Sequence, residues 1–277
     1  MKTIKIYAML TILTMCSCEK FSAEDTKDSG NKDNNVSIEL PQDETVKKTC
    51  QKVSFGFFKD DEKVGATNQS ADDANFGTIH LNLASGTYQV VAIGHNGIGS
   101  CTISSPEKIT FTSNKMTDTF YYYGTLEVKS DENTSEVITM QRAVAMFRLT
   151  IKDDIPENAK KIKFYYTGGS STLNAVTGYG CVNSKQTEII DIKPEQKTYE
   201  VYTFPHADGK KLNMTISILD ENDFTIASTH FTDVQVTKNY ITTYSGKLFT
   251  NTSEGSGSIK IEFEFNPEWA GETKYNF

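Results

Sequence analysis

Apolar residues alternate with polar or small residues over much of the chain after residue 35. A period of two is typical of a β-strand with one buried face, whereas an amphipathic helix repeats every 3.6 residues. The alternation is clearest in Val53–Phe58, Ile79–Ala84 and Ala143–Ile151. After the N-terminal segment, no stretch combines a helical apolar period with a capping residue and a terminal glycine. The sequence therefore predicts an all-β protein.

The first series of expected strands occupies residues 36–140. Val53, Phe55 and Phe57 form the expected buried face of one strand, opposite the side that carries Phe58. A Ser-Gly pair at 85–86 ends the next run, and the following apolar stretch is expected to return beside it as a hairpin.

A second series occupies residues 141–277, and its first strand should bury Ala143, Ala145, Phe147, Leu149 and Ile151 on one face. The boundary is placed near residue 141 because a single sandwich of about fifteen strands would be unusually large. Many short strands separated by turns indicate β-sandwiches, so two domains are expected, 36–140 and 141–277.

The N-terminal segment has a different pattern. Lys2 and Lys5 precede an apolar stretch from Ile6 to Met15. A membrane helix needs about twenty apolar residues, so this stretch is too short to span a bilayer and is typical of a secretory signal.

Ser17-Cys18 at the end of that stretch resembles a lipobox, in which the cysteine is acylated and the signal is cut before it. Residues 1–17 are therefore predicted to be a lipoprotein signal peptide and Cys18 the lipidation site. Cys16 is the weaker candidate because the bulky Met15 precedes it. An ordinary signal peptide with two incidental cysteines is the alternative.

Residues 18–35 are predicted to be a flexible tether, because they are highly charged and contain one aromatic residue. The acidic positions in this tether resemble the surface-export signal of Bacteroidetes lipoproteins, which favours the outer face of the outer membrane. Cleavage before Cys18 would remove two lysines and leave 26 basic residues against 36 acidic ones, a net charge of about −10. Nucleic acid is excluded as a partner, since its binding depends on basic patches.

Three cysteines follow the lipidation site, and none belongs to a CxxC motif. Cys50 and Cys101 could pair if they share a domain, although buried free thiols are the favoured interpretation for an odd number of scattered cysteines. Cys181 is the third.

Catalytic and metal-binding motifs are absent from the sequence. The four histidines are scattered without zinc-site spacing, and there is no GxSxG, SxxK, HExxH, P-loop or GxGxxG motif. The acidic turns Asp131–Asn133 and Asp220–Asp223 lack the spacing of a calcium loop and are predicted to be hairpin turns. No cofactor, metal or catalytic residue is expected.

Aromatic residues are the remaining candidates for a binding surface. Phe120–Tyr123, Phe164–Tyr166 and Trp269 could stack on sugars, but consecutive aromatics on a strand also serve both faces of a sheet, which is the favoured interpretation. Glycines at 168–169 and in Gly178-Tyr179-Gly180 are interpreted as loop glycines.

Several segments together resemble the type V fimbrial family of Bacteroidales, the fimbrillins and their FimB-like anchor and accessory subunits. The segments are Gly86–Ala92 with His95-Asn96, Gln141–Leu149, Asp154–Asn158 and Phe265–Trp269. The resemblance implies two tandem transthyretin-like β-sandwiches, a non-enzymatic role in a fimbria or pilus, and assembly with other fimbrial subunits by strand exchange. In that mode main-chain hydrogen bonds supply affinity and alternating side chains fill pockets.

The role within a fimbria can be argued from arginine. Shaft subunits of this family are typically cut after a basic residue, often arginine, near the end of the first strand. Arg142 and Arg148 are the only arginines, and a cut there would remove the whole first sandwich. This favours an uncut, lipid-anchored anchor or accessory subunit, while Lys47 and Lys48 leave a shaft or tip pilin open.

A rival interpretation is a surface glycan-binding lipoprotein of a polysaccharide uptake system, which would share the lipobox and the tandem sandwiches. Exposed aromatics on a flat platform would support it, and aromatics buried between sheets would count against it. A host receptor or glycan ligand is not identified by any motif.

Overall fold

The computed structural model describes residues 35–40, 49–249, 262–264 and 269–276. They form β-strands joined by turns, with one short 3₁₀-helix, η1 (Thr112–Asn114), and the prediction of an all-β protein is confirmed. Within these residues we find no helix with the length and apolarity to cross a membrane.

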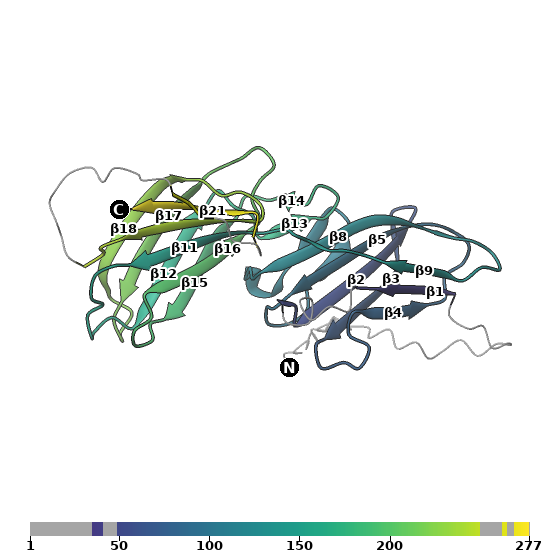
Figure 1. The fold of residues 1–277 in the computed structure, drawn as a ribbon, viewed down its shortest axis with the longest axis horizontal. Coiled ribbons are helices and arrows are strands. Elements are labelled where there is room, and N and C mark those ends of the chain that lie inside the picture. Colours follow the sequence, from purple (N-terminus) through teal and green to yellow (C-terminus); the bar gives the residue numbers. More distant parts are fainter. Residues whose placement is uncertain (1–34, 41–48, 250–261, 265–268, 277) are drawn as a thin grey trace, which may run out of the picture. The chain divides into compact units, whose positions relative to one another are not determined.

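Twenty-one strands are described (Figure 1). Those before residue 143 are β1 (Val36–Glu39), β2 (Lys52–Lys59), β3 (Glu62–Ser70), β4 (Thr78–Leu81), β5 (Gly86–His95), β6 (Thr102–Ser105), β7 (Lys108–Thr110), β8 (Thr119–Val128), β9 (Thr134–Val137) and β10 (Gln141–Arg142). The later ones are β11 (Ala145–Ile151), β12 (Lys161–Thr167), β13 (Thr172–Asn174), β14 (Tyr179–Gly180), β15 (Lys185–Asp191), β16 (Thr198–Thr203), β17 (Leu212–Leu219), β18 (Thr225–Val234), β19 (Tyr240–Gly246), β20 (Glu262–Glu264) and β21 (Gly271–Asn276).

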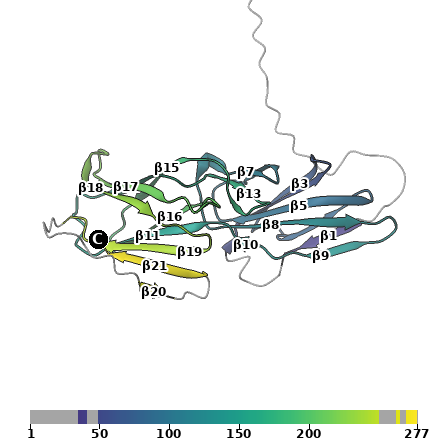
Figure 2. The same cartoon turned by 90° about the horizontal axis from the view of Figure 1, so that it is seen from above.

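These strands form five sheets. The three-stranded sheet has the order β4-β1-β9, and the central sheet has the order β10-β8-β5-β2-β3. The mixed sheet, β16-β11-β19-β21-β20, contains parallel pairs (Figure 2). The antiparallel sheet has the order β15-β12-β17-β18. A fifth sheet, called the shared sheet here, has the order β14-β13-β7-β6.

β2 of the central sheet is buried on both faces. Phe55 and Phe57 of β2 pack with residues of the three-stranded sheet, such as Ile38. Phe58 of the same strand packs on the opposite side with Ile103 and other residues of the shared sheet. The expected buried face of β2 is confirmed, but Phe58 is only 1% exposed, because the side assigned to solvent is also covered.

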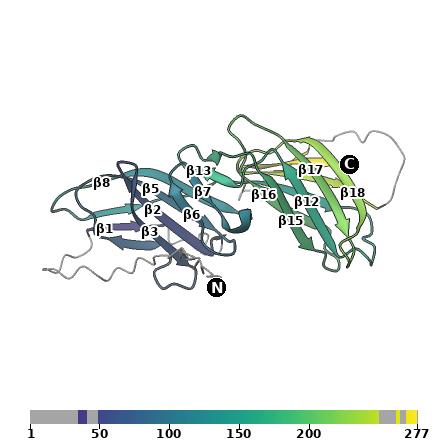
Figure 3. The same ribbon diagram turned by 180° about the vertical axis from the view of Figure 1, so that it is seen from behind.

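The shared sheet combines strands that are far apart in the sequence. β13 lies beside β7 (Figure 3) and pairs with it. In this pair Leu173 lies opposite Ile109. The chain leaves β12 through Gly168, whose φ of +93° is a conformation that favours glycine. The boundary near residue 141 stays a prediction: the chain passes there from β10 of the central sheet to β11 of the mixed sheet, and the hairpin β13–β14 pairs back with β7.

The mixed and antiparallel sheets enclose a second apolar core. Ala145, Phe147, Leu149 and Ile151 of β11 point into it, as the period of two predicts. Ala143 is also buried, although it belongs to the cluster beside the shared sheet.

Two predicted turns differ from the structure. β4 pairs with β1 and β5 pairs with β2 and β8, so the hairpin expected around residues 85–86 is wrong. The turn at Asp131–Asn133 joins β8 to β9, which pairs in parallel with β1, so it is not a hairpin turn. The turn at Asp220–Asp223 is a hairpin turn between β17 and β18, as predicted.

Candidate functional site

The predicted lipidation site, Cys18, lies outside the described residues, as do the signal peptide and the two lysines, Lys47 and Lys48, considered as cleavage sites. Of the predicted tether, only Asn35 is described. These assignments stay predictions.

The first described strand, β1, occupies the centre of its sheet. It pairs antiparallel with β4 and parallel with β9. Val36 and Ile38, with Leu40 just after the strand, are buried in the core between this sheet and the central sheet. The Asn35 side chain fixes the start of the strand by accepting a hydrogen bond from the Leu83 amide and donating one to the Leu83 carbonyl. The short segment from Val36 to Leu40 therefore supplies three buried residues to this core.

Arg142 has a largely buried side chain, 9% exposed, that binds groups from separate parts of the chain. Its Nε and Nη2 donate to the two carboxylate oxygens of Asp118 at 2.7 and 3.0 Å, and its Nη1 donates to Asn239 Oδ1 at 3.1 Å. The guanidinium also lies 3.9 Å from the centroid of the Trp269 ring and 4.6 Å from that of Phe120. Bidentate pairing and ring stacking use the planar shape of arginine, which lysine lacks.

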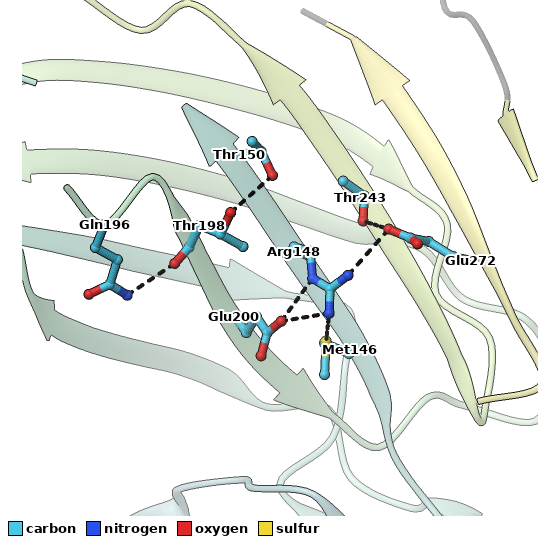
Figure 4. Close-up of polar contacts among 8 residues, drawn as sticks. All are labelled: Met146, Arg148, Thr150, Gln196, Thr198, Glu200, Thr243 and Glu272. Carbon is cyan, nitrogen blue, oxygen red and sulfur yellow. Dashed lines mark hydrogen bonds and ion pairs between the residues drawn. The ribbon is translucent and has the colours of Figure 1, made fainter. Parts of the chain in front are cut away.

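Arg148 lies on the solvent-facing side of the mixed sheet (Figure 4). Its Nε and Nη2 contact Glu200 Oε1 at 2.8 and 2.7 Å, and its Nη1 lies 3.5 Å from Glu272 Oε1. Glu272 is buried and also accepts a hydrogen bond from the Thr243 hydroxyl. The guanidinium charge is thus offset by two carboxylates.

Hydroxyl groups extend this polar surface along the same face. Thr150 and Thr198 lie opposite each other with their hydroxyls 3.5 Å apart, and Gln196 donates to the Thr198 carbonyl (Figure 4). Thr150, Thr198, Ser245 and Lys274 line an open hollow of about 410 Å³ around Arg148.

Histidines and cysteines form no chemical site in the described residues, where no three potential metal ligands come together. His80 and His230 are exposed, His206 is half-buried, and His95 is buried. Cys50 and Cys101 are buried free thiols, and burial raises their pKa values to about 12 and about 11, whereas Cys181 is free and exposed. A thiol with a raised pKa is a poor nucleophile at neutral pH.

The aromatic segments mainly serve the cores, as predicted. Phe120 and Tyr122 pack on one face of the central sheet, and Tyr121 and Tyr123 pack on the other. Trp269 is 6% exposed and is covered by Arg142.

In the second aromatic segment, Phe164 and Tyr166 are buried, and only Tyr165 reaches solvent. These segments therefore provide no flat platform of several exposed rings.

The loop glycines mark the crossover into the shared sheet rather than a ligand site. Gly168 leads into β13, and Gly178 lies between β13 and β14 with a φ of +71°, against the ring of Tyr121. Lys238 adds a contact from another segment, donating to the Tyr121 hydroxyl at 3.3 Å. The glycine clusters in the sequence indicate a loop at this junction, but no feature of the sequence identifies β7 as the strand with which β13 pairs.

A family model described as "Family of unknown function (DUF6562)" matches residues 100–277. The chain belongs to this family. The matched region includes β11 to β21 and also β7 and β8, so it covers both Arg142 and its partner Asp118. No curated protein matches the chain.

The chain is similar to several solved structures. A protein of Bacteroides ovatus described as an adhesin superposes with a TM-score of 0.51 at 15% identity, over 73% of this chain and 83% of that one. A second B. ovatus protein, described as a cell adhesion protein, gives a TM-score of 0.46 at 12% identity over 77% and 92% of the two chains. The fimbrial anchor protein Mfa2 of Porphyromonas gingivalis gives 0.39 at 12% identity over 70% and 80%. At such identities the first match shows a shared fold.

Proposed function

We propose that this chain is a non-enzymatic subunit of a surface fimbria, held in the outer membrane as a lipid-anchored anchor or accessory subunit. The observation that carries the proposal is the position of β1. The shared fold with an adhesin and the resemblance of the sequence segments to type V fimbrial subunits support the same class.

β1 has the properties that strand addition requires. It is the N-terminal described strand, it is central in a three-stranded sheet, and its alternate residues Val36 and Ile38 are buried. Without it, β4 and β9 would each lose a main-chain partner and the core would be open along a groove. Such a groove is the type of site that an extended strand of another subunit fills.

Arginine-directed cleavage is disfavoured by the surroundings of both arginines. Arg142 is stacked on Trp269 and paired with Asp118, and Arg148 is paired with Glu200 and Glu272 within a sheet. Proteases cleave extended, accessible segments, so neither site is suited to removal of the first strand. This supports an uncut subunit in which β1 stays in its own sheet.

The alternative of a surface glycan-binding lipoprotein receives less support. Trp269 is buried, and the rings of Phe120–Tyr123 are divided between two cores, so of the aromatic segments singled out in the sequence only Tyr165 is exposed for stacking on sugars. A shaft or tip pilin stays an alternative, and its processing would differ from that of our proposal.

Mapping the N-terminus of the surface protein by mass spectrometry tests the proposal. We expect a diacylated peptide beginning at Cys18. Cys18→Ala should release the protein from the membrane fraction or block its processing, whereas Cys16→Ala should leave it membrane-bound. Equal retention of both variants would overturn the lipid anchor.

A shaft pilin would give a different peptide. Its N-terminus would lie after Lys47 or Lys48, about thirty residues further on, without lipid. Finding that form as the main species in long filaments would overturn the anchor role and leave the fimbrial class in place. Deletion of the gene should leave filaments that are shed or uncontrolled in length.

A further inference from the structure

β18 is a long strand at the edge of the antiparallel sheet. It runs for ten residues and pairs with β17. From Thr225 to His230, no strand pair or backbone hydrogen bond within the described part of the chain involves its second edge. Unpaired N–H and C=O groups in a row are a template for pairing with another strand.

Two other long edge strands, β3 and β15, carry features that oppose such pairing. β3 begins with Glu62 and Lys63, and its pairing with β2 has a register shift near that end. β15, at the opposite edge of the antiparallel sheet, carries Lys185, Glu188 and Asp191. Charged side chains on an edge oppose the approach of a second strand because they would have to be desolvated.

β18 lacks this protection. Thr225–Thr232 contains no Asp, Glu, Lys, Arg or proline. Phe224, just before the strand, is 70% exposed, and Ile226 is 36% exposed. The register with β17 is regular from Ala227 to Phe231, between two shifts, so the middle of the strand is straight enough to accept a partner.

We propose that β18 pairs antiparallel with β18 of a second copy of this chain. An antiparallel pair of identical strands has a two-fold axis, so one segment supplies both sides of the contact. With the axis at Ser228, Ile226 would lie opposite His230 of the second copy, and Ala227 opposite Thr229. The contact would join two four-stranded sheets into one of eight strands.

The net charge of the molecule restricts the surfaces at which two copies can meet. The chain carries a net charge of −8, so two copies repel each other except where the facing surfaces are neutral. The middle of β18 meets that condition, because its uncharged residues can face themselves without opposing like charges. The contact is small, so we expect a dimer that dissociates on dilution.

Cysteine scanning tests the pairing and its register. Single cysteines are placed at 226, 227, 228, 229 and 230 of the full chain, in a Cys181→Ser background because Cys181 is an exposed thiol. The chain is purified in a mild detergent and oxidised. Directly opposed residues of antiparallel strands have Cα atoms about 4.5–5.5 Å apart, which suits a disulfide. Thr187→Cys, exposed on β15 at the other edge of the same sheet, is the matched control.

We expect a covalent dimer whose yield peaks at one position, nearest Ser228, and falls on either side, with at least fivefold less dimer for Thr187→Cys. Ser228→Lys in the otherwise unaltered chain should shift the mass measured by light scattering from dimer to monomer, with an unchanged circular dichroism spectrum. Uniform cross-linking at all positions, cross-linking equal to the control, or a parent chain that stays monomeric at high concentration would each overturn the proposal. Cross-linking in cells to a different protein only would overturn it as well.

Discussion

The central sheet and the mixed sheet bury their strands in different ways. In β2 of the central sheet, Ser54, Phe55 and Phe58 are all buried, because one face meets the three-stranded sheet and the other meets the shared sheet. In β11 of the mixed sheet, buried Phe147 and Leu149 alternate with Arg148 and Thr150, which remain half-buried on the solvent side. The central sheet is thus the middle of three layers, and the mixed sheet is half of a two-layer sandwich.

This difference follows from where the covering strands originate. The second cover of the central sheet includes β13, which enters from the later half of the chain. The core between the mixed and antiparallel sheets uses strands from β11 onward. The earlier half therefore depends on the later half more than the reverse.

The largest effect should follow from separating the halves. Residues 36–140 lack β13 and β14, so Ile103 and Ile109 would lose Leu173 and be exposed. We expect this fragment to aggregate or to unfold without a cooperative transition, while residues 141–277 retain one. Thermal unfolding followed by circular dichroism would compare them. A cooperative transition in 36–140 would show that the first domain is self-sufficient.

The local pattern predicted a considerable part of this fold. The period of two identified the buried face of β11, and the aromatic run of β8 was correctly divided between two faces. Both predictions depend on geometry within one strand, where side chains must point to opposite sides.

The features that the sequence did not predict depend on contacts between residues that are far apart in the chain. Ser54 and Gly56 make β2 look like a strand with one polar face, although small residues also fit beneath a second layer. The partners of Arg142 lie 24 and 97 residues away, so no spacing rule pointed to them. Strand order likewise depends on pairing between distant segments, as the missing hairpin at residues 85–86 shows.

Alanine substitutions of buried phenylalanines allow the mixed sheet to be compared with the central sheet. Phe147→Ala should lower the free energy of unfolding by roughly 3–5 kcal/mol, the usual loss for a buried phenylalanine. Phe58→Ala, on the face that the alternation left to solvent, should lower it by a similar amount because that face is covered. Tyr165→Ala is the control and should cost about 1 kcal/mol or less. Urea unfolding measures all three, and a small effect for Phe58→Ala would mean that the second cover contributes little.

Substitutions of Arg142 and Arg148 compare a largely buried ion pair with a more exposed one. Arg142→Ala leaves the Asp118 carboxylate without its main partner and should cost roughly 3–5 kcal/mol, because an uncompensated charge stays buried. Arg148→Ala should cost less, since solvent reaches its side chain and Glu200.

A double variant tests this explanation. Arg142→Ala with Asp118→Asn should recover part of the loss, as measured by urea unfolding. No recovery would indicate that Arg142 acts through its stacking on Trp269 and Phe120 instead.

The smallest expected effect is a loss of stability at acidic pH that arises from His95 in the central sheet. His95 of β5 is 3% exposed, and its Nδ1 accepts a hydrogen bond from the Gly97 amide while its Nε2 has no hydrogen-bond partner among the described residues. Burial, with a contribution from the charge of Lys52, lowers the pKa of His95 to about 4. His95 takes up a proton near pH 6.5 in the unfolded chain and near pH 4 in the folded protein. The stability that depends on a neutral His95 is therefore fully present above pH 6.5 and is lost as the pH falls from 6.5 to 4.

Linkage limits the loss from this histidine to about 3 kcal/mol at pH 4. Other groups also titrate in this range, so the informative quantity is the difference between the parent and His95→Gln. We expect the parent to lose more stability than His95→Gln between pH 6.5 and 4, as measured by urea unfolding at each pH. His80→Gln, exposed on β4 of the three-stranded sheet, is the matched control and should follow the parent. Parallel curves for the parent and His95→Gln would mean that solvent reaches His95 and that the second layer over the central sheet opens readily.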